Sequence, residues 1–210
     1  KEKQADPVLA AMKSLSSGDQ LLLLSTLGRI GGKAALERIE SAIAQSDALT
    51  HDTGIRAICN WPDASTASRL IELTKSDKHA DHQIRALRAL IRIAPLPDGR
   101  TDVEKLELLK QAMPLCTRDT ERTLVLERAA AIRIPETLRY LMPYVEQPEF
   151  AETACGSIVE LAHHRELREP NKEEFDAALT KVKQTSKDPI VVDRADRYMK
   201  NQTWVRPTTP

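Results

Sequence analysis

The feature that most constrains this chain is a short helical pattern that recurs along it. Its clearest copy is Asp81–Pro95, with the sequence DHQIRALRALIRIAP. Within it, Ile84, Leu87 and Ile91 are spaced so that they share one face of a helix with 3.6 residues per turn. An acidic residue favours the N-terminal end of such a helix, and a proline ends it. The segment is therefore predicted to be an amphipathic helix with one apolar face.

The same pattern returns at uneven intervals. Residues 52–57 match residues 81–86 in the acid and in the Ile-Arg-Ala that follows it, and residues 121–135 match less closely. Weaker copies keep only an acid three residues before an apolar residue or a cysteine. The six acids, 29 to 40 residues apart, are Asp19, Asp52, Asp81, Glu121, Glu152 and Asp188. A period in this range is typical of helical solenoids.

One copy of the pattern cannot fold alone. Its aliphatic side chains contribute roughly 1.5–3 kcal/mol each when buried, whereas fixing each backbone residue costs roughly 1–2 kcal/mol. Each helix pair must therefore share its core with its neighbours. We predict an all-α fold, an α-α superhelix of about six helix pairs over residues 17–200. Residues 1–16 are expected to contain a short helix, and residues 201–210 to form a tail or linker.

The repeated motif resembles HEAT-type repeats, including the bacterial HEAT-like class named for bilin lyases. The residues that carry the resemblance are Asp52, Ile55, Arg56, Ala57, Asp81, Ile84, Arg85 and Ala86, with a partial match at Glu121 and Arg128. The turn at residues 61–63 is also similar to HEAT-like regions of secreted bacterial proteins. The resemblance implies a binding module within a larger multidomain bacterial protein, in a secreted or periplasmic location.

Composition narrows the range of partners. The chain has 31 basic and 31 acidic residues, so no net charge attracts it to nucleic acid or to an anionic membrane. Aromatic residues make up 3%, which is few for base-stacking surfaces. No apolar run approaches the roughly 18 residues of a membrane span. The chain begins at Lys1 without an apolar signal segment, and we expect a mature form or a part of a larger protein.

Arginines form a second stripe on the repeated helix. Arginine binds carboxylates and phosphates with a planar, bidentate fork. The predicted partner-binding arginines are Arg56, Arg85, Arg88, Arg92 and Arg128. The alternative is that these side chains pair with acids of neighbouring repeats or extend into solvent.

Trp61 is a further candidate for partner binding, because tryptophan is enriched among residues that dominate interface energies. It lies in the turn that follows the repeat at residues 52–60. The alternative is that its ring covers the edge of the core.

No other group of residues predicts a site. His79 and His82 could share a helix face near Asp77 and Asp81, but no third ligand follows at a regular spacing. We interpret both histidines as surface residues and predict no metal ion and no cofactor. The three cysteines lack any CxxC spacing and are expected to be buried as small apolar residues. The glycine-rich stretch at 28–32 follows a helix rather than a strand, so a phosphate-binding loop is not expected.

We therefore predict a non-catalytic protein-interaction or scaffold module with no catalytic residues. Its partner would be another protein or a neighbouring domain of the same chain. The alternative is an enzyme built on HEAT repeats, such as an alkylated-base DNA glycosylase, which would need a basic, aromatic-lined groove and a carboxylate beside a flipped base. A bilin lyase is a third interpretation, but nothing in the sequence indicates a tetrapyrrole pocket.

Overall fold

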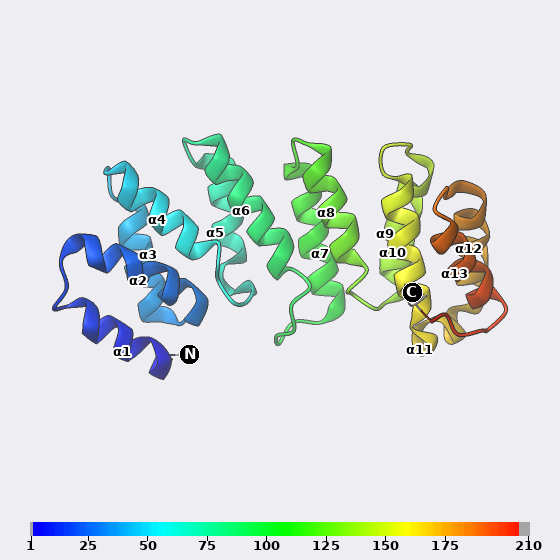
Figure 1. Cartoon of the computed structure of the whole chain (residues 1–210), viewed down its shortest axis with the longest axis horizontal. Helices are drawn as coiled ribbons and strands as arrows, with labels where there is room; N and C mark the ends of the chain where they lie inside the picture. The colour runs from blue at the N-terminus through cyan, green and yellow to red at the C-terminus, as the bar shows by residue number, and fades with distance from the viewer. Residues whose placement is uncertain (1, 206–210) are drawn as a thin grey trace, which may run out of the picture. The chain divides into compact units, whose positions relative to one another are not determined.

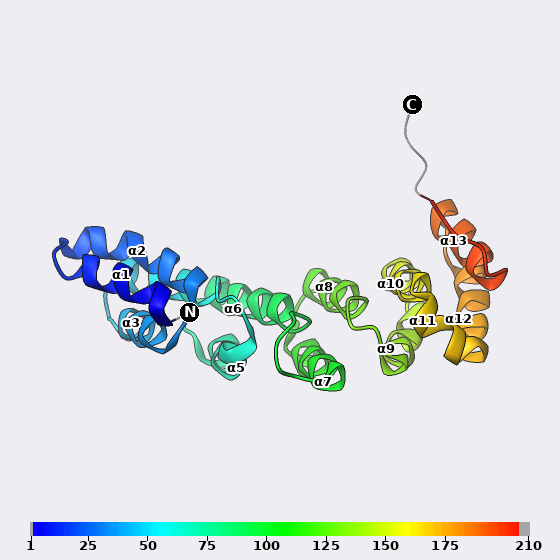
Figure 2. The ribbon, with the colours of Figure 1, turned by 90° about the horizontal axis from the view of Figure 1, so that it is seen from below.

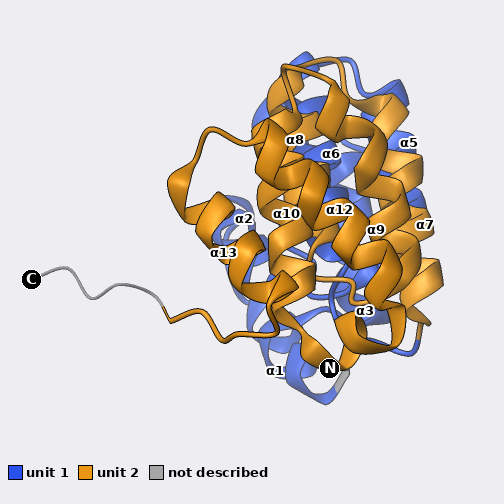
Figure 3. Cartoon of the chain, turned by 90° about the vertical axis from the view of Figure 1, so that its right-hand side faces the viewer, with its two compact units in different colours: residues 1–99 blue, residues 100–210 orange. Residues whose placement is uncertain are grey.

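The computed structural model describes residues 2–205, and the chain divides into two compact units (Figure 3). Unit 1 comprises residues 1–99 and unit 2 residues 100–210, so the boundary follows the proline- and glycine-containing turn at 95–99. Within residues 2–205 every regular element is a helix and no strand is present. The predicted all-α fold is confirmed.

Unit 1 contains six α-helices and one short 3-10 helix. They are α1 (Glu2–Met12), α2 (Ser17–Ile30), α3 (Lys33–Ile43), α4 (Ala48–Ile58), η1 (Ala64–Thr66), α5 (Ala67–Ser76) and α6 (Ala80–Ile93). Helix α3 packs against α4, and α5 against α6. Helices α2 and α6 lie in one layer, and α3 and α5 in the other (Figures 1 and 2). Helix α4 contacts both α2 and α6. The short helix expected within residues 1–16 is α1, which packs on α2 and α3.

The core of unit 1 lies between these helices and follows the predicted apolar face. In α6, Leu87, Leu90 and Ile91 are buried, and Ile84 is partly exposed. Helix α4 contributes Ile55 and Ile58, which are both fully buried. The equivalent positions Ile58 and Leu87 are thus buried on two adjacent helices, whereas Ile55 is buried and its equivalent Ile84 is partly exposed.

The start of α4 differs from the position that the motif predicts. Asp81 lies in the first turn of α6, as expected. Asp52, however, lies inside α4, which begins at Ala48 because the Asp47 side chain caps it by accepting a hydrogen bond of 2.9 Å from the Thr50 amide. The expectation that Asp52 opens its helix is therefore wrong. Its carboxylate contacts side chains instead of capping the backbone.

Two glycines allow α4 to approach its neighbours closely. A Cβ atom on Gly28, in α2, would lie 2.1 Å from the Ala57 carbonyl oxygen of α4. A Cβ atom on Gly54 would lie 2.8 Å from the Ile43 side chain and 2.9 Å from its backbone nitrogen in α3. Helix α2 continues through Gly28 and ends at Ile30, before two glycines with positive φ.

Unit 2 is built in the same manner from paired helices. They are α7 (Asp102–Ala112), η2 (Met113–Leu115), α8 (Asp119–Ala129), α9 (Pro135–Leu141), η3 (Met142–Glu146), α10 (Ala151–His163), α11 (Arg165–Arg168), η4 (Glu169–Asn171), α12 (Lys172–Thr185) and α13 (Pro189–Met199). Helices α7 and α9 lie in one layer, and α8 and α10 in the other (Figure 2). Helix α12 packs against α10 and α13. None of the helices in residues 2–205 is long and apolar enough to cross a membrane.

The expected tail is described only in part. Residues 201–205 follow α13 without forming a helix. The remainder of the predicted tail, 206–210, lies outside the described residues.

Candidate functional site

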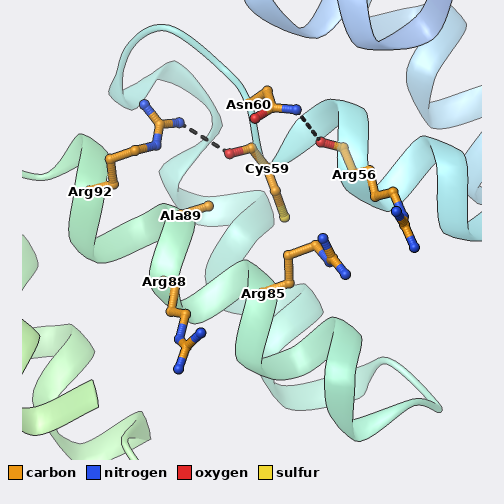
Figure 4. A pocket seen from close by; sticks show the side chains of 7 residues that line it. All are labelled: Arg56, Cys59, Asn60, Arg85, Arg88, Ala89 and Arg92. Atoms are coloured by element: carbon orange, nitrogen blue, oxygen red, sulfur yellow. Dashed lines mark hydrogen bonds between the residues drawn. The ribbon is translucent and has the colours of Figure 1, made fainter. Parts of the chain in front are cut away.

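The structure brings four of the five predicted arginines to one pocket of unit 1, which we term the arginine groove (Figure 4). The groove has a volume of about 410 Å³. Its lining residues come from α4, the two residues that follow it, and α6, and are Arg56, Cys59, Asn60, Arg85, Arg88, Ala89 and Arg92.

The repeated motif explains why these side chains meet. Arg56 and Arg85 hold the same place in the Ile-Arg-Ala of their copies, and α4 and α6 are packing neighbours. On α6, Arg88 lies three residues after Arg85, and Arg92 lies four residues after Arg88. These spacings place all three side chains along one face of the helix. The groove is therefore the meeting place of the arginine stripes of two repeats.

Two of the four arginines, Arg92 and Arg56, make hydrogen bonds to residues in or directly after α4. The Nη2 atom of Arg92 donates to the carbonyl oxygens of Cys59 (3.1 Å) and Trp61 (2.7 Å), at the end of α4 (Figure 4). Such bonds satisfy carbonyl groups that have no partner within the helix. The Nε atom of Arg56 donates to Asp52 one turn earlier, at 2.7 Å, although the Arg56 side chain is 57% exposed. Arg92 therefore links α6 to the end of α4, whereas Arg56 remains accessible from the groove.

The other two arginines of the groove are Arg85 and Arg88. Arg88 is exposed at the surface. Arg85 is half-buried and extends towards Cys59 and α4 (Figure 4). Its Nε atom is buried and has no hydrogen-bond partner within the described part of the chain. Buried donors are almost always paired, so this N–H group is a position at which an incoming acceptor would be stabilised.

Cys59 lies in the groove but is not a nucleophile. Burial raises the pKa of its thiol to about 12, although Arg85 and Arg92 oppose this shift. The thiolate is the reactive form of cysteine, so the thiol is inert at neutral pH. All three cysteines are buried and free of disulfide bonds, as the sequence predicts.

The other two predicted binding residues lie elsewhere. Arg128 is exposed in α8, which belongs to unit 2, and does not line the groove. Trp61 is 2% exposed, and its indole N–H donates to the Ser65 hydroxyl at 2.8 Å. Its ring therefore covers the edge of the core, which is the alternative stated for it above, and its side chain is not available to a partner.

The interpretation of His82 as a surface residue is wrong. Its side chain is buried, and its two ring nitrogens lie 3.1 Å from carboxylate oxygens of Asp77 and Asp52. His51, which the sequence analysis did not single out, lies on the other side of Asp77. The signal available in the sequence was that three of the five histidines lie within two residues of Asp52 or Asp81, the acids of the two clearest copies of the motif.

The fold and the groove define an all-α protein of packed helix pairs that presents clustered guanidinium groups in unit 1. No known protein family and no curated protein matches its sequence. Any assignment of function therefore depends on the chemistry of its own side chains.

Proposed function

We propose that this chain is a HEAT-like binding module whose arginine groove holds an acidic segment of a protein partner or of a neighbouring domain. The observation that carries the proposal is the buried, unpartnered Nε atom of Arg85 in a groove lined by three further arginines. A buried donor without an acceptor costs about 1–3 kcal/mol. A carboxylate placed there would recover that cost and would gain a charge-assisted hydrogen bond.

The size and composition of the groove favour an extended acidic peptide. A volume of about 410 Å³ has room for one or two side chains and not for a folded element. The half-exposed Arg56 lies beside Arg85 and can pair with a further carboxylate along the peptide (Figure 4). No lining residue is aromatic, whereas proteins that hold single-stranded nucleic acid stack its bases on aromatic rings.

The test is direct binding of a defined probe. A fluorescein-labelled peptide of alternating glutamate and glycine would be titrated with the protein, and its anisotropy followed at low and at physiological salt. A peptide with glutamine in place of glutamate would serve as the uncharged control. We expect the acidic peptide alone to bind. The variant R85Q/R88Q should weaken its binding by about tenfold or more, because the charge-assisted contact of Arg85 and the positive charge of Arg88 beside it are both lost.

A matched variant separates the groove from the general charge of the protein. R29Q/R165Q removes the same two charges at exposed positions that do not line the groove, and it should bind the peptide like the wild type. Helical circular dichroism would confirm that both double variants are folded. Equal weakening in both would overturn the proposal, as would absence of binding by the wild type. Tighter binding of an oligonucleotide than of the peptide would favour the glycosylase alternative instead.

A further inference from the structure

A second group of side chains in unit 1 has the donor set of a metal site. His51, Asp77 and His82, which we term the histidine cluster, each offer one ligand atom, and these three atoms lie within 4.8 Å of one another. The Nε2 atom of His51 is 3.1 Å from Asp77 Oδ2, and the Nδ1 atom of His82 is 3.1 Å from Asp77 Oδ1. The single carboxylate thus lies between two imidazole rings.

The three residues come from three different helices or their ends. His51 lies in α4, Asp77 directly follows α5, and His82 lies in the first turns of α6. The side chain of Asp77 is only 2% exposed and accepts a hydrogen bond of 2.9 Å from the backbone amide of His79. The position of the carboxylate is therefore fixed by the turn that joins α5 to α6.

The hydrogen bonds of His51 leave a lone pair directed at Asp77. Its Nδ1 atom is 2.6 Å from the carbonyl oxygen of Ile43. Because a carbonyl oxygen can only accept, Nδ1 must carry the proton. A neutral imidazole has only one N–H group, so Nε2 then faces the Asp77 carboxylate with a lone pair. Two acceptors 3.1 Å apart repel each other unless a positive charge lies between them.

His82 has the same conflict. Its Nε2 atom is 3.1 Å from Asp52 Oδ1, and its Nδ1 atom is 3.1 Å from Asp77 Oδ1. In the neutral ring only one of these nitrogens can donate. If Nε2 donates to Asp52, then the Nδ1 lone pair also faces Asp77. The two lone pairs then face the two oxygens of the same carboxylate.

We propose that His51 Nε2, His82 Nδ1 and a carboxylate oxygen of Asp77 bind a divalent transition-metal ion, for which Zn²⁺ is the best match. Two imidazoles with one carboxylate form a donor set typical of zinc, with bonds of about 2.0–2.2 Å. Ligand atoms of a tetrahedral site with such bonds are about 3.3–3.6 Å apart. Each imidazole nitrogen lies 3.1 Å from its own oxygen of Asp77, and one ligand atom from each residue lies within 4.8 Å of the others, so small side-chain movements would complete the site. The bound cation would remove the repulsion between the acceptors.

The groups around the cluster would orient its ligands. Metal-binding histidines usually donate their other N–H group to a carbonyl or a carboxylate. The Ile43 carbonyl has this role for His51, and the Asp52 carboxylate has it for His82. His51 and Asp77 also line a pocket together with the exposed His79. This pocket would admit the metal ion and leave its fourth coordination position to water.

The ionisation of Asp77 is consistent with this role. Burial opposes ionisation of its carboxyl group, but hydrogen bonding to the carboxylate, above all from the His79 backbone amide, lowers its pKa. The group is therefore ionised at neutral pH, as a metal-binding carboxylate must be.

The test is titration of the chelator-treated protein with Zn²⁺ alone at neutral pH, followed by calorimetry and by thermal unfolding. We expect one ion per chain and a melting temperature that rises with zinc concentration. Co²⁺ in place of Zn²⁺ should give the visible absorption of a tetrahedral site. H51Q should weaken zinc binding by about tenfold or more, and D52N, which removes only an orienting group, should weaken it by about 10–100-fold.

The control is H163Q/H164Q, which removes two adjacent histidines of unit 2 and should leave zinc binding unchanged. Unchanged binding in H51Q would place the ion elsewhere and overturn the proposal. Absence of binding would also overturn it. Nitrogen chemical shifts would then be expected to show both imidazoles doubly protonated, with the cluster held as a network of ion pairs.

Discussion

The close approach of α2 to α4 at Gly28 leads to a sharp prediction for the substitution Gly28→Ala. The added methyl carbon would lie 2.1 Å from the Ala57 carbonyl oxygen and 2.8 Å from the carbonyl carbon. A carbon–oxygen contact without strain is about 3.3 Å. Helices α2 and α4 would therefore have to separate by about 1.2 Å. The two atoms of Ala57 that the methyl carbon would meet belong to the helix backbone, so no side-chain rotation can relieve the overlap.

The expected magnitude follows from two opposing effects. Overpacking of a core contact costs about 1–3 kcal/mol and more when the backbone must move. Replacing glycine by alanine within a helix stabilises by roughly 0.5–1 kcal/mol. We expect a net loss of about 2 kcal/mol from the free energy of unfolding of unit 1. For a unit of this size, that corresponds to a melting temperature lower by about 10 °C.

The measurement can be restricted to unit 1. The chain has two tryptophans, and Trp61 is buried in unit 1. In a Trp204→Phe background, Trp61 fluorescence during urea unfolding would report on that unit, even if the two units unfold separately. The control is Gly18→Ala, because Gly18 lies in the same helix with no atom within 4 Å of the added carbon. It should be neutral or slightly stabilising. A Gly28→Ala variant as stable as the Gly18→Ala variant would refute the close packing of α2 against α4.

Two further predictions concern the core and the C-terminal helices. Leu87→Asp, at a side chain that is 3% exposed, should destabilise unit 1 by at least about 3 kcal/mol by burying an unpaired charge. The same change at Leu22, which is 73% exposed, should have little effect, and equal urea midpoints for the two variants would contradict the assigned core. Hydrogen bonds from Lys183 and Lys200 lower the pKa of Asp196 from 3.8 to about 2. A lowered carboxyl pKa stabilises the fold above its unfolded-state value, so the difference in melting temperature between wild type and Asp196→Asn should be constant above about pH 4 and disappear towards pH 2. A difference that persists at the lowest pH would show that the lysines do not act through the charge of Asp196.

The fold could be predicted from the sequence wherever the pattern was local. The apolar spacing in residues 81–95 identified the buried face of α6, because side chains three and four residues apart share a helix face. The start of α4 was missed because Asp47 competes with Asp52 as the cap, and spacing alone cannot decide between them. Gly28 was assigned to a helix end. Its function as a contact surface depends on how α4 crosses α2, which no local pattern specifies.

The same distinction applies to the candidate sites. The stripe formed by Arg85, Arg88 and Arg92 could be recognised from the sequence because one helix carries all three residues. Arg56 could be added to it because it holds the same motif position as Arg85. His51 could not, since it meets an aspartate 26 residues further along the chain. That contact arises only once α4 packs beside the turn between α5 and α6. Trp61 illustrates the opposite error, because its residue type favoured an interface but its position at the end of α4 buries the ring.

Asp52 connects the two proposed sites, and this decides which substitutions can separate them. One of its oxygens contacts the Nε2 atom of His82 in the histidine cluster, and the other accepts from the Nε atom of Arg56 in the arginine groove. Groups that share a partner are energetically coupled, so changes at Asp52 or Arg56 will affect both sites and their effects will not add. In the described part of the chain the Asp52 carboxylate bonds to Arg56 and His82 and to neither Arg85 nor His51, so R85Q/R88Q and H51Q test the groove and the cluster one at a time. If both sites bind, an acidic peptide that pairs with Arg56 competes with Asp52 for it. By linkage, any factor by which zinc changes peptide affinity must equal the factor by which the peptide changes zinc affinity.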